Sequence, residues 1–235
     1  MRTVLLFLLA FTTQISAREL APPASARQLI VVSTRSWSDT SGTLQRFERR
    51  QSSESWRAVG PAISVKVGSA GMAWGLGLHP NPPGGPRKIE GDKRAPAGIF
   101  RLPTAFGFDA KPEGVTLPYL RVVPGIEGVD DPKSRFYNQL VDRADIAKPD
   151  WHSSEKMHAV GQEYRLGIFV AHNPNAIPGQ GSCIFLPVWK NPNHATTGCT
   201  AMPLAAIAEI QNWLRRDGNP VLIQVPREFL PATLR

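Results

Sequence analysis

The sequence predicts a mainly β fold with flanking helices. Short apolar runs rich in Ile, Val and Phe follow one another along the first third of the chain, and glycine and proline turns separate them. The chain holds 20 glycines and 22 prolines, which is typical of many short elements rather than a few long ones. Only residues 203–214 carry a clear helical period, and no internal repeat or heptad is present.

The first 17 residues have the pattern of a signal peptide. Arg2 precedes an unbroken apolar run over residues 4–11, and polar residues then lead to a cleavage site after Ala17. A run this short is below the length of a membrane-spanning helix, although an uncleaved anchor is the alternative interpretation. Residues 24–26 offer a second cleavage site further downstream. The pattern therefore predicts an exported protein, with residues 18–27 as a Pro/Ala/Ser linker.

The rest of the chain has the size and composition of one globular domain. Hydrophobic residues make up 42% of the sequence and charged residues 20%, which is far from the composition of a disordered chain. No later run is long and apolar enough for stable membrane insertion. We expect a single domain over residues 28–228 and a C-terminal tail over residues 229–235.

The charge balance favours an anionic partner. Twenty-seven lysines and arginines against 19 acidic residues give a net charge of +8. These charges do not gather into a basic tract interleaved with aromatic residues, so the footprint of a nucleic-acid-binding protein is missing. An anionic polymer of the cell envelope is the partner that suits an exported protein.

The predicted elements follow in chain order. An Ile- and Val-rich strand over residues 28–34 leads into weaker strands, and residues 74–88 form a loop rich in glycine and proline. Residues 130–157 read as an irregular region, in which the paired acids Asp130 and Asp131 belong to a solvated loop because no further ligands accompany them at metal-binding spacing. We expect strands at residues 28–34, 42–49, 56–59, 63–67, 164–171 and 183–189, and a short strand at the end of residues 90–102. We also expect a helix that begins with Pro203 in its first turn and buries Leu204, Ile207, Ile210 and Leu214.

Cys199 is the candidate nucleophile. It lies in a Thr-Thr-Gly-Cys turn shortly before the predicted helix, where free backbone N–H groups and the helix dipole favour a thiolate. The same N–H groups, with Gly198 allowing close approach, suit the oxyanion of an acyl-transfer reaction. Two other interpretations stay open: a disulfide between Cys199 and Cys183, and a buried cysteine that only fills space.

Several phrases of the sequence resemble one family. They are GDKRAPAGIF at residues 91–100, DDPKSRFYN at 130–138, WHSSEKM at 151–157, VAHN at 170–173, and GSCIFL at 181–186 followed by TTGCTAM at 196–202. Together they resemble the YkuD-like L,D-transpeptidase catalytic domain, and more narrowly its exported proteobacterial branch with a Thr-x-Gly-Cys motif. The resemblance extends over residues 28–225.

The resemblance implies a sandwich-like or barrel-like β domain that acts on peptidoglycan stem peptides in the periplasm. A cysteine of the family attacks the carbonyl of the third stem residue, expels the terminal D-alanine and passes the acyl group to an amine or to water. Carried over to this chain, Cys199 is the nucleophile, and Thr197 and Gly198 frame the oxyanion site. The thiolate supplies the chemistry, so neither a metal nor an organic cofactor is implied.

One position departs from the family pattern. The strand before the loop normally ends in a Phe-Leu-His phrase, and here Pro187 takes the place of the histidine that polarises the thiol. His194 in the connecting loop and His172 at the end of the neighbouring strand are the candidate replacements. Without a replacement, the chain would be a catalytically impaired peptidoglycan-binding member, and with an oxidised cysteine pair it would be a structural protein of the periplasm.

Overall fold

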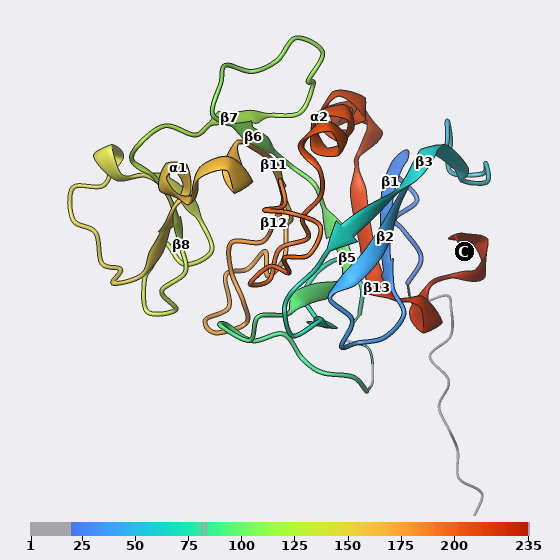
Figure 1. The fold of residues 1–235 in the computed structure, drawn as a ribbon, viewed down its shortest axis with the longest axis horizontal. Helices are drawn as coiled ribbons and strands as arrows, with labels where there is room; N and C mark the ends of the chain where they lie inside the picture. The colour runs from blue at the N-terminus through green and yellow to red at the C-terminus, as the bar shows by residue number, and fades with distance from the viewer. Residues whose placement is uncertain (1–19, 81, 83, 235) are drawn as a thin grey trace, which may run out of the picture.

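Three β-sheets hold most of the regular secondary structure of the protein, a computed structural model that describes residues 20–80, 82 and 84–234 (Figure 1). The mainly β prediction is therefore confirmed. The expected signal peptide, residues 1–17, lies outside the described residues. Among the described residues no helix has the length and apolar character needed to cross a bilayer.

The largest sheet has six strands in the order β3-β2-β1-β13-β5-β4. Its central strand β1 pairs in parallel with β13 near the C-terminal end and antiparallel with β2, so the two ends of the chain meet in one sheet. The apolar runs pair because both faces of β1 and β13 are almost wholly buried. The strands are β1 Gln28–Thr34, β2 Ser41–Glu48, β3 Arg57–Lys66, β4 Met72–Trp74, β5 Ala95–Arg101 and β13 Val221–Pro226.

The strand β3 corrects one expectation. Residues 56–59 and 63–67 were expected as two strands because Gly60-Pro61 is a turn signal, but β3 runs through both. The register of the β2–β3 pair shifts between Leu44 and Arg46, and Gly60 has a φ of +65°. A bulge therefore absorbs the turn signal without ending the strand.

The second sheet has the order β12-β11-β6-β7. Its strands are β6 Ala105–Gly107, β7 Tyr119–Arg121, β11 Leu166–Phe169 and β12 Phe185–Pro187. Both β11 and β12 are shorter than the strands expected at residues 164–171 and 183–189. Pro187 ends an edge strand, which is where a residue without a backbone N–H fits a sheet.

The third sheet occupies the region that was expected to be irregular. Strands β8 Ile126–Val129, β9 Leu140–Asp142 and β10 Ser154–Lys156 pair antiparallel in the order β10-β8-β9. They are too short, and too polar in β10, to give a strand pattern in the sequence. Helix α1 Met157–Val160 and the 3₁₀ turn η2 Gly161–Tyr164 follow β10 directly, beside β8 (Figure 1). The other 3₁₀ turns are η1 Arg143–Asp145, η3 Arg216–Gly218, η4 Arg227–Phe229 and η5 Ala232–Leu234.

The predicted helix is α2 Leu204–Trp213. Pro203 is its N-cap rather than its first-turn residue. Ile207, Ile210 and the following Leu214 are buried as expected, but Leu204 is 41% exposed, so the buried face is narrower than the spacing suggested.

Both ends of the described chain belong to the folded body. Leu20 and Ala26 are buried in the main hydrophobic cluster, and so are Leu230 and Leu234. The expected linker at residues 18–27 and the expected tail at residues 229–235 therefore carry core residues over their described parts. Each segment is too short and too rich in Ala and Pro for this packing to be read from its sequence.

Candidate active site

Cys199 lies in the turn between β12 and α2, and a backbone N–H points at its sulfur. The N–H of Phe185, the first residue of β12, donates to Cys199 Sγ over 3.3 Å. The side chain is half-buried, while Cys183 is buried, and both thiols are free. The disulfide alternative is therefore not what the structure shows.

The helix N-terminus is not adjacent to the sulfur, which corrects the expectation. Helix α2 begins only at Leu204, and between it and Cys199 the chain pairs twice with strand residues, Ala201 with Lys66 and Met202 with Val188. The field of a helix end fades within about one turn. The backbone N–H that faces the sulfur comes from Phe185 of β12, and not from the N-terminus of α2 as the sequence suggested.

The environment keeps the thiol protonated. Burial, together with the charge of the Glu155 carboxyl group, raises the pKa of Cys199 to about 12, against the lowering effect of the Phe185 amide that donates to the sulfur. A thiol is a poor nucleophile and a thiolate is a good one. Chemistry at Cys199 near neutral pH therefore needs a group that takes the thiol proton as the sulfur attacks.

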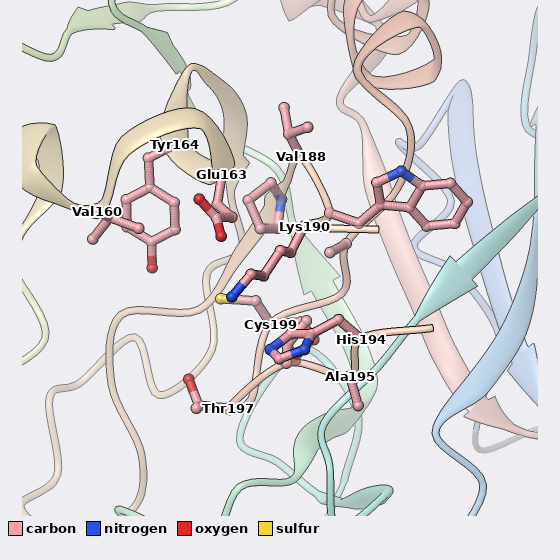
Figure 2. A pocket seen from close by; sticks show the side chains of 13 residues that line it. Val160, Glu163, Tyr164, Val188, Lys190, His194, Ala195, Thr197 and Cys199 are labelled. Atoms are coloured by element: carbon pink, nitrogen blue, oxygen red, sulfur yellow. The ribbon is translucent and has the colours of Figure 1, made fainter. Parts of the chain in front are cut away.

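Cys199 lines two separate cavities. The first has a volume of about 180 Å³ and includes Glu163, Tyr164, Lys190 and His194 (Figure 2). Figure 2 shows the side chains of Lys190 and His194 on the same side of this cavity as the cysteine. The rest of the cavity wall is largely apolar and includes Pro187, the last residue of β12, and the adjacent Val188.

The second cavity, of about 240 Å³, is strongly charged. Glu90, Asp130 and Glu155 contribute carboxyl groups, and Lys88 and Lys93 contribute amines. Asp130 Oδ1 is buried and has no hydrogen-bond partner among the described residues. The sulfur can thus be approached from an apolar side and from an acidic side.

The two candidate histidines differ in position. His194 is exposed and lines the first cavity together with Cys199. His172 lines neither cavity and is 1% exposed; its Nδ1 accepts from the Leu76 amide at 3.2 Å and its Nε2 donates to the Gln180 carbonyl at 2.9 Å. Burial lowers the pKa of His172 to about 4. His172 therefore has no free nitrogen for proton transfer and serves the structure of the strand end.

Thr197 and Gly198, the expected oxyanion residues, offer fewer hydrogen-bond donors than the motif suggested. The Gly198 N–H donates to the Thr196 hydroxyl over 3.1 Å, and Thr197 is exposed at the mouth of both cavities. The N–H of Cys199 itself donates to no group within residues 20–80, 82 and 84–234. The backbone amide of the nucleophile is thus the available donor for an oxyanion.

Two residues near the sulfur were not identified from the sequence. The Tyr164 hydroxyl donates to Glu155 Oε2 over 2.5 Å, and Tyr164 lines the first cavity together with Cys199. Burial raises the pKa of Glu155 to about 7, against the hydrogen bond from Tyr164 and with help from the charges of Asp130 and Glu90. Glu155 belongs to the WHSSEKM phrase, but nothing in the sequence joins it to Tyr164 or to Cys199.

Within the part of the chain that the structure describes, no three His, Cys, Asp or Glu side chains are placed to hold a metal ion. No family model, no curated protein and no solved structure matches the chain. The site therefore has to be interpreted from its own geometry.

Proposed function

We propose that the protein is a cysteine acyltransferase of the L,D-transpeptidase type that acts on peptidoglycan stem peptides in the periplasm, with the YkuD-like domain as its fold. The observation that carries the proposal is the position of Cys199, whose sulfur receives a backbone N–H and borders two cavities. A space-filling or purely structural cysteine needs neither cavity. The net charge of +8 suits an anionic wall polymer.

The two cavities suit the two halves of an acyl transfer. An acyl donor bound in the first cavity presents its carbonyl carbon to the Cys199 sulfur, and the Cys199 N–H stabilises the oxyanion of the tetrahedral intermediate. Collapse of that intermediate expels D-alanine and leaves a thioester. An amine or water then enters through the acidic cavity, whose carboxyl groups attract a protonated amine, and releases the acyl group.

The proposal is tested with purified muropeptides that carry tetrapeptide stems ending in D-alanine. We expect the protein to release D-alanine and Cys199→Ala to release none, because the thioester cannot form. Cys183→Ala is the matched control, since it removes the other free thiol while leaving the nucleophile in place. Equal release by the wild-type protein and by Cys199→Ala would refute the proposal.

A second candidate function is a peptidoglycan-binding protein that has lost most of its turnover. Two observations favour it: Pro187 lines the cavity where the related enzymes place a histidine, and the Cys199 thiol has a raised pKa. In that case the protein sediments with purified cell-wall sacculi but releases little D-alanine. Pro187→His then raises the release by about 10²-fold, the usual contribution of a general base. An unchanged rate in Pro187→His, beside measurable wild-type turnover, would reject this candidate.

A further inference from the structure

The group that accepts the thiol proton is the open question of the proposed mechanism. The strand position that would supply an imidazole is Pro187, and both ring nitrogens of His172 are bonded to the backbone. His194 is exposed and has no hydrogen bond to Cys199. The sulfur itself is hydrogen-bonded to two backbone groups, the Phe185 amide and the Cys183 carbonyl, and neither can take up the proton.

Tyr164 shares the first cavity with Cys199 and is hydrogen-bonded to Glu155. A phenol has one proton and two lone pairs. The Tyr164 hydroxyl donates its proton to Glu155 Oε2 at 2.5 Å, so its oxygen still has lone pairs that can accept a proton. In the resting structure the Cys199 S–H donates to the Cys183 carbonyl at 4.0 Å, so it turns to Tyr164 for the transfer. Tyr164 borders the first cavity with Cys199, and Glu155 borders the second cavity with Cys199.

We propose that Glu155, acting through the hydroxyl of Tyr164, takes the proton of the Cys199 thiol when the sulfur attacks an acyl donor. This inference rests on the proposed role of Cys199 as the nucleophile. As the sulfur–carbon bond forms, the carbonyl π electrons move to oxygen, the S–H proton passes to Tyr164 Oη, and the tyrosine proton passes to Glu155. The protonated Glu155 returns the proton by the same route to the leaving amine, so no other acid or base is consumed.

The surroundings of Glu155 fit a proton acceptor near neutral pH. The half-buried carboxyl group lies beside other acids, so its pKa is raised to about 7, where it is part carboxylate and part acid. The arrangement joins three elements, since Glu155 is on β10, Tyr164 ends η2 and Cys199 follows β12. The titratable and charged groups that face Glu155 or share its cavity are Tyr164, Asp130, Glu90, Lys88, Lys93, Cys183 and Cys199.

The test measures the rate of alkylation of Cys199 by iodoacetamide between pH 5 and pH 10, followed by mass spectrometry of the peptide that contains Cys199. In the wild-type protein we expect the rate to rise with an inflection near pH 7, where Glu155 becomes a carboxylate. In Glu155→Gln the inflection disappears and the rate at pH 8 falls by about 10²-fold. Tyr164→Phe gives the same loss because the proton has no path to Glu155.

Matched variants separate this role from a structural one. Glu113→Gln removes an exposed carboxyl group that borders neither cavity, and Tyr119→Phe removes a hydroxyl that donates to the Asp109 carbonyl. Both should keep the wild-type profile, as should His194→Gln. An inflection near pH 7 that persists in Glu155→Gln and in Tyr164→Phe overturns the proposal, and its loss in His194→Gln instead assigns the proton to His194. Circular dichroism melting confirms that each variant compared is folded.

The alkylation assay does not depend on the natural acyl donor. A Glu155-dependent profile in a protein that releases no D-alanine leaves this inference standing and rejects the proposed substrate. Release of D-alanine together with a profile that Glu155→Gln leaves unchanged rejects this inference alone. The two failures are therefore distinguishable.

Discussion

At the scale of single residues, burial and hydrogen bonding act on the thiol of Cys199 in opposite directions. Burial wins, so the resting group is a thiol, and the Phe185 amide at 3.3 Å stabilises the thiolate only once the proton has left. The same competition leaves His172 neutral, because its burial outweighs its two backbone hydrogen bonds. At both residues, the loss of contact with water decides the direction in which the pKa shifts.

The neutral His172 makes folding stability depend on pH. Its pKa is about 4 in the folded protein and 6.5 in an unfolded chain, so only the unfolded chain takes up the proton between these values. Stability is therefore full above pH 6.5 and falls by about 3 kcal/mol as the pH drops to 4. Urea unfolding at several pH values measures this slope.

The variant His172→Gln isolates the contribution of the histidine from those of titrating carboxyl groups. It should be less stable at pH 7 and show a flatter dependence between pH 6.5 and pH 4. An identical slope in the wild-type protein and in His172→Gln would show that folding does not lower the pKa of His172.

At the scale of elements, the site depends on how α2 and the four-stranded sheet are joined. The buried Gln211 of α2 donates to the Phe106 carbonyl of β6 at 2.9 Å and to the Gly167 carbonyl of β11 at 2.7 Å. One side chain thus ties the helix to two strands, and β11 in turn pairs with β12, which carries Phe185. The position of the amide that faces the sulfur depends on this connection.

Replacing Gln211 tests that connection. Gln211→Leu leaves two buried carbonyl groups without this donor, so we expect a loss of about 1–3 kcal/mol in the free energy of unfolding. The same substitution at the exposed Gln162 should change stability by less than about 0.5 kcal/mol. Chemical denaturation compares the two, and equal effects would contradict the assigned role.

The elements also show where the sequence was informative. The strand β1 has the predicted bounds because its apolar run is long and cleanly bounded. The bounds of β3 were missed because Gly60-Pro61 is a turn signal that a bulge overrides. Glu155 and Tyr164 were missed because their meeting depends on the packing of β10 against η2, and the local sequence of neither segment encodes it.

At the scale of the whole molecule, both ends of the described chain close the main core. Leu20 and Ala26 enter it at one end and Leu230 and Leu234 at the other, while β1 and β13 pair side by side (Figure 1). Cys199 is proposed as the nucleophile from a local turn motif, but the limits of the folded body could not be read in this way, because burial of a terminal leucine depends on residues far away in sequence. We infer that these ends stabilise the domain.

Truncating a terminal leucine measures that stabilisation. Leu234 is 4% exposed, so Leu234→Ala should cost about 2–5 kcal/mol in the free energy of unfolding. Leu204→Ala is the matched control, because Leu204 is 41% exposed and should cost much less. Similar losses in the two variants would mean that the C-terminal segment does not pack as described.

The most direct test of the whole account is capture of an acyl group by Cys199. A carbapenem is a strained acyl donor, and we predict that intact-protein mass spectrometry shows the mass of one added carbapenem, located by peptide mapping on Cys199 and absent in Cys199→Ala. Cys183, buried and outside the first cavity, should stay unmodified. An unlabelled Cys199 under conditions that label an active L,D-transpeptidase, or an adduct on Cys183 instead, would contradict the account.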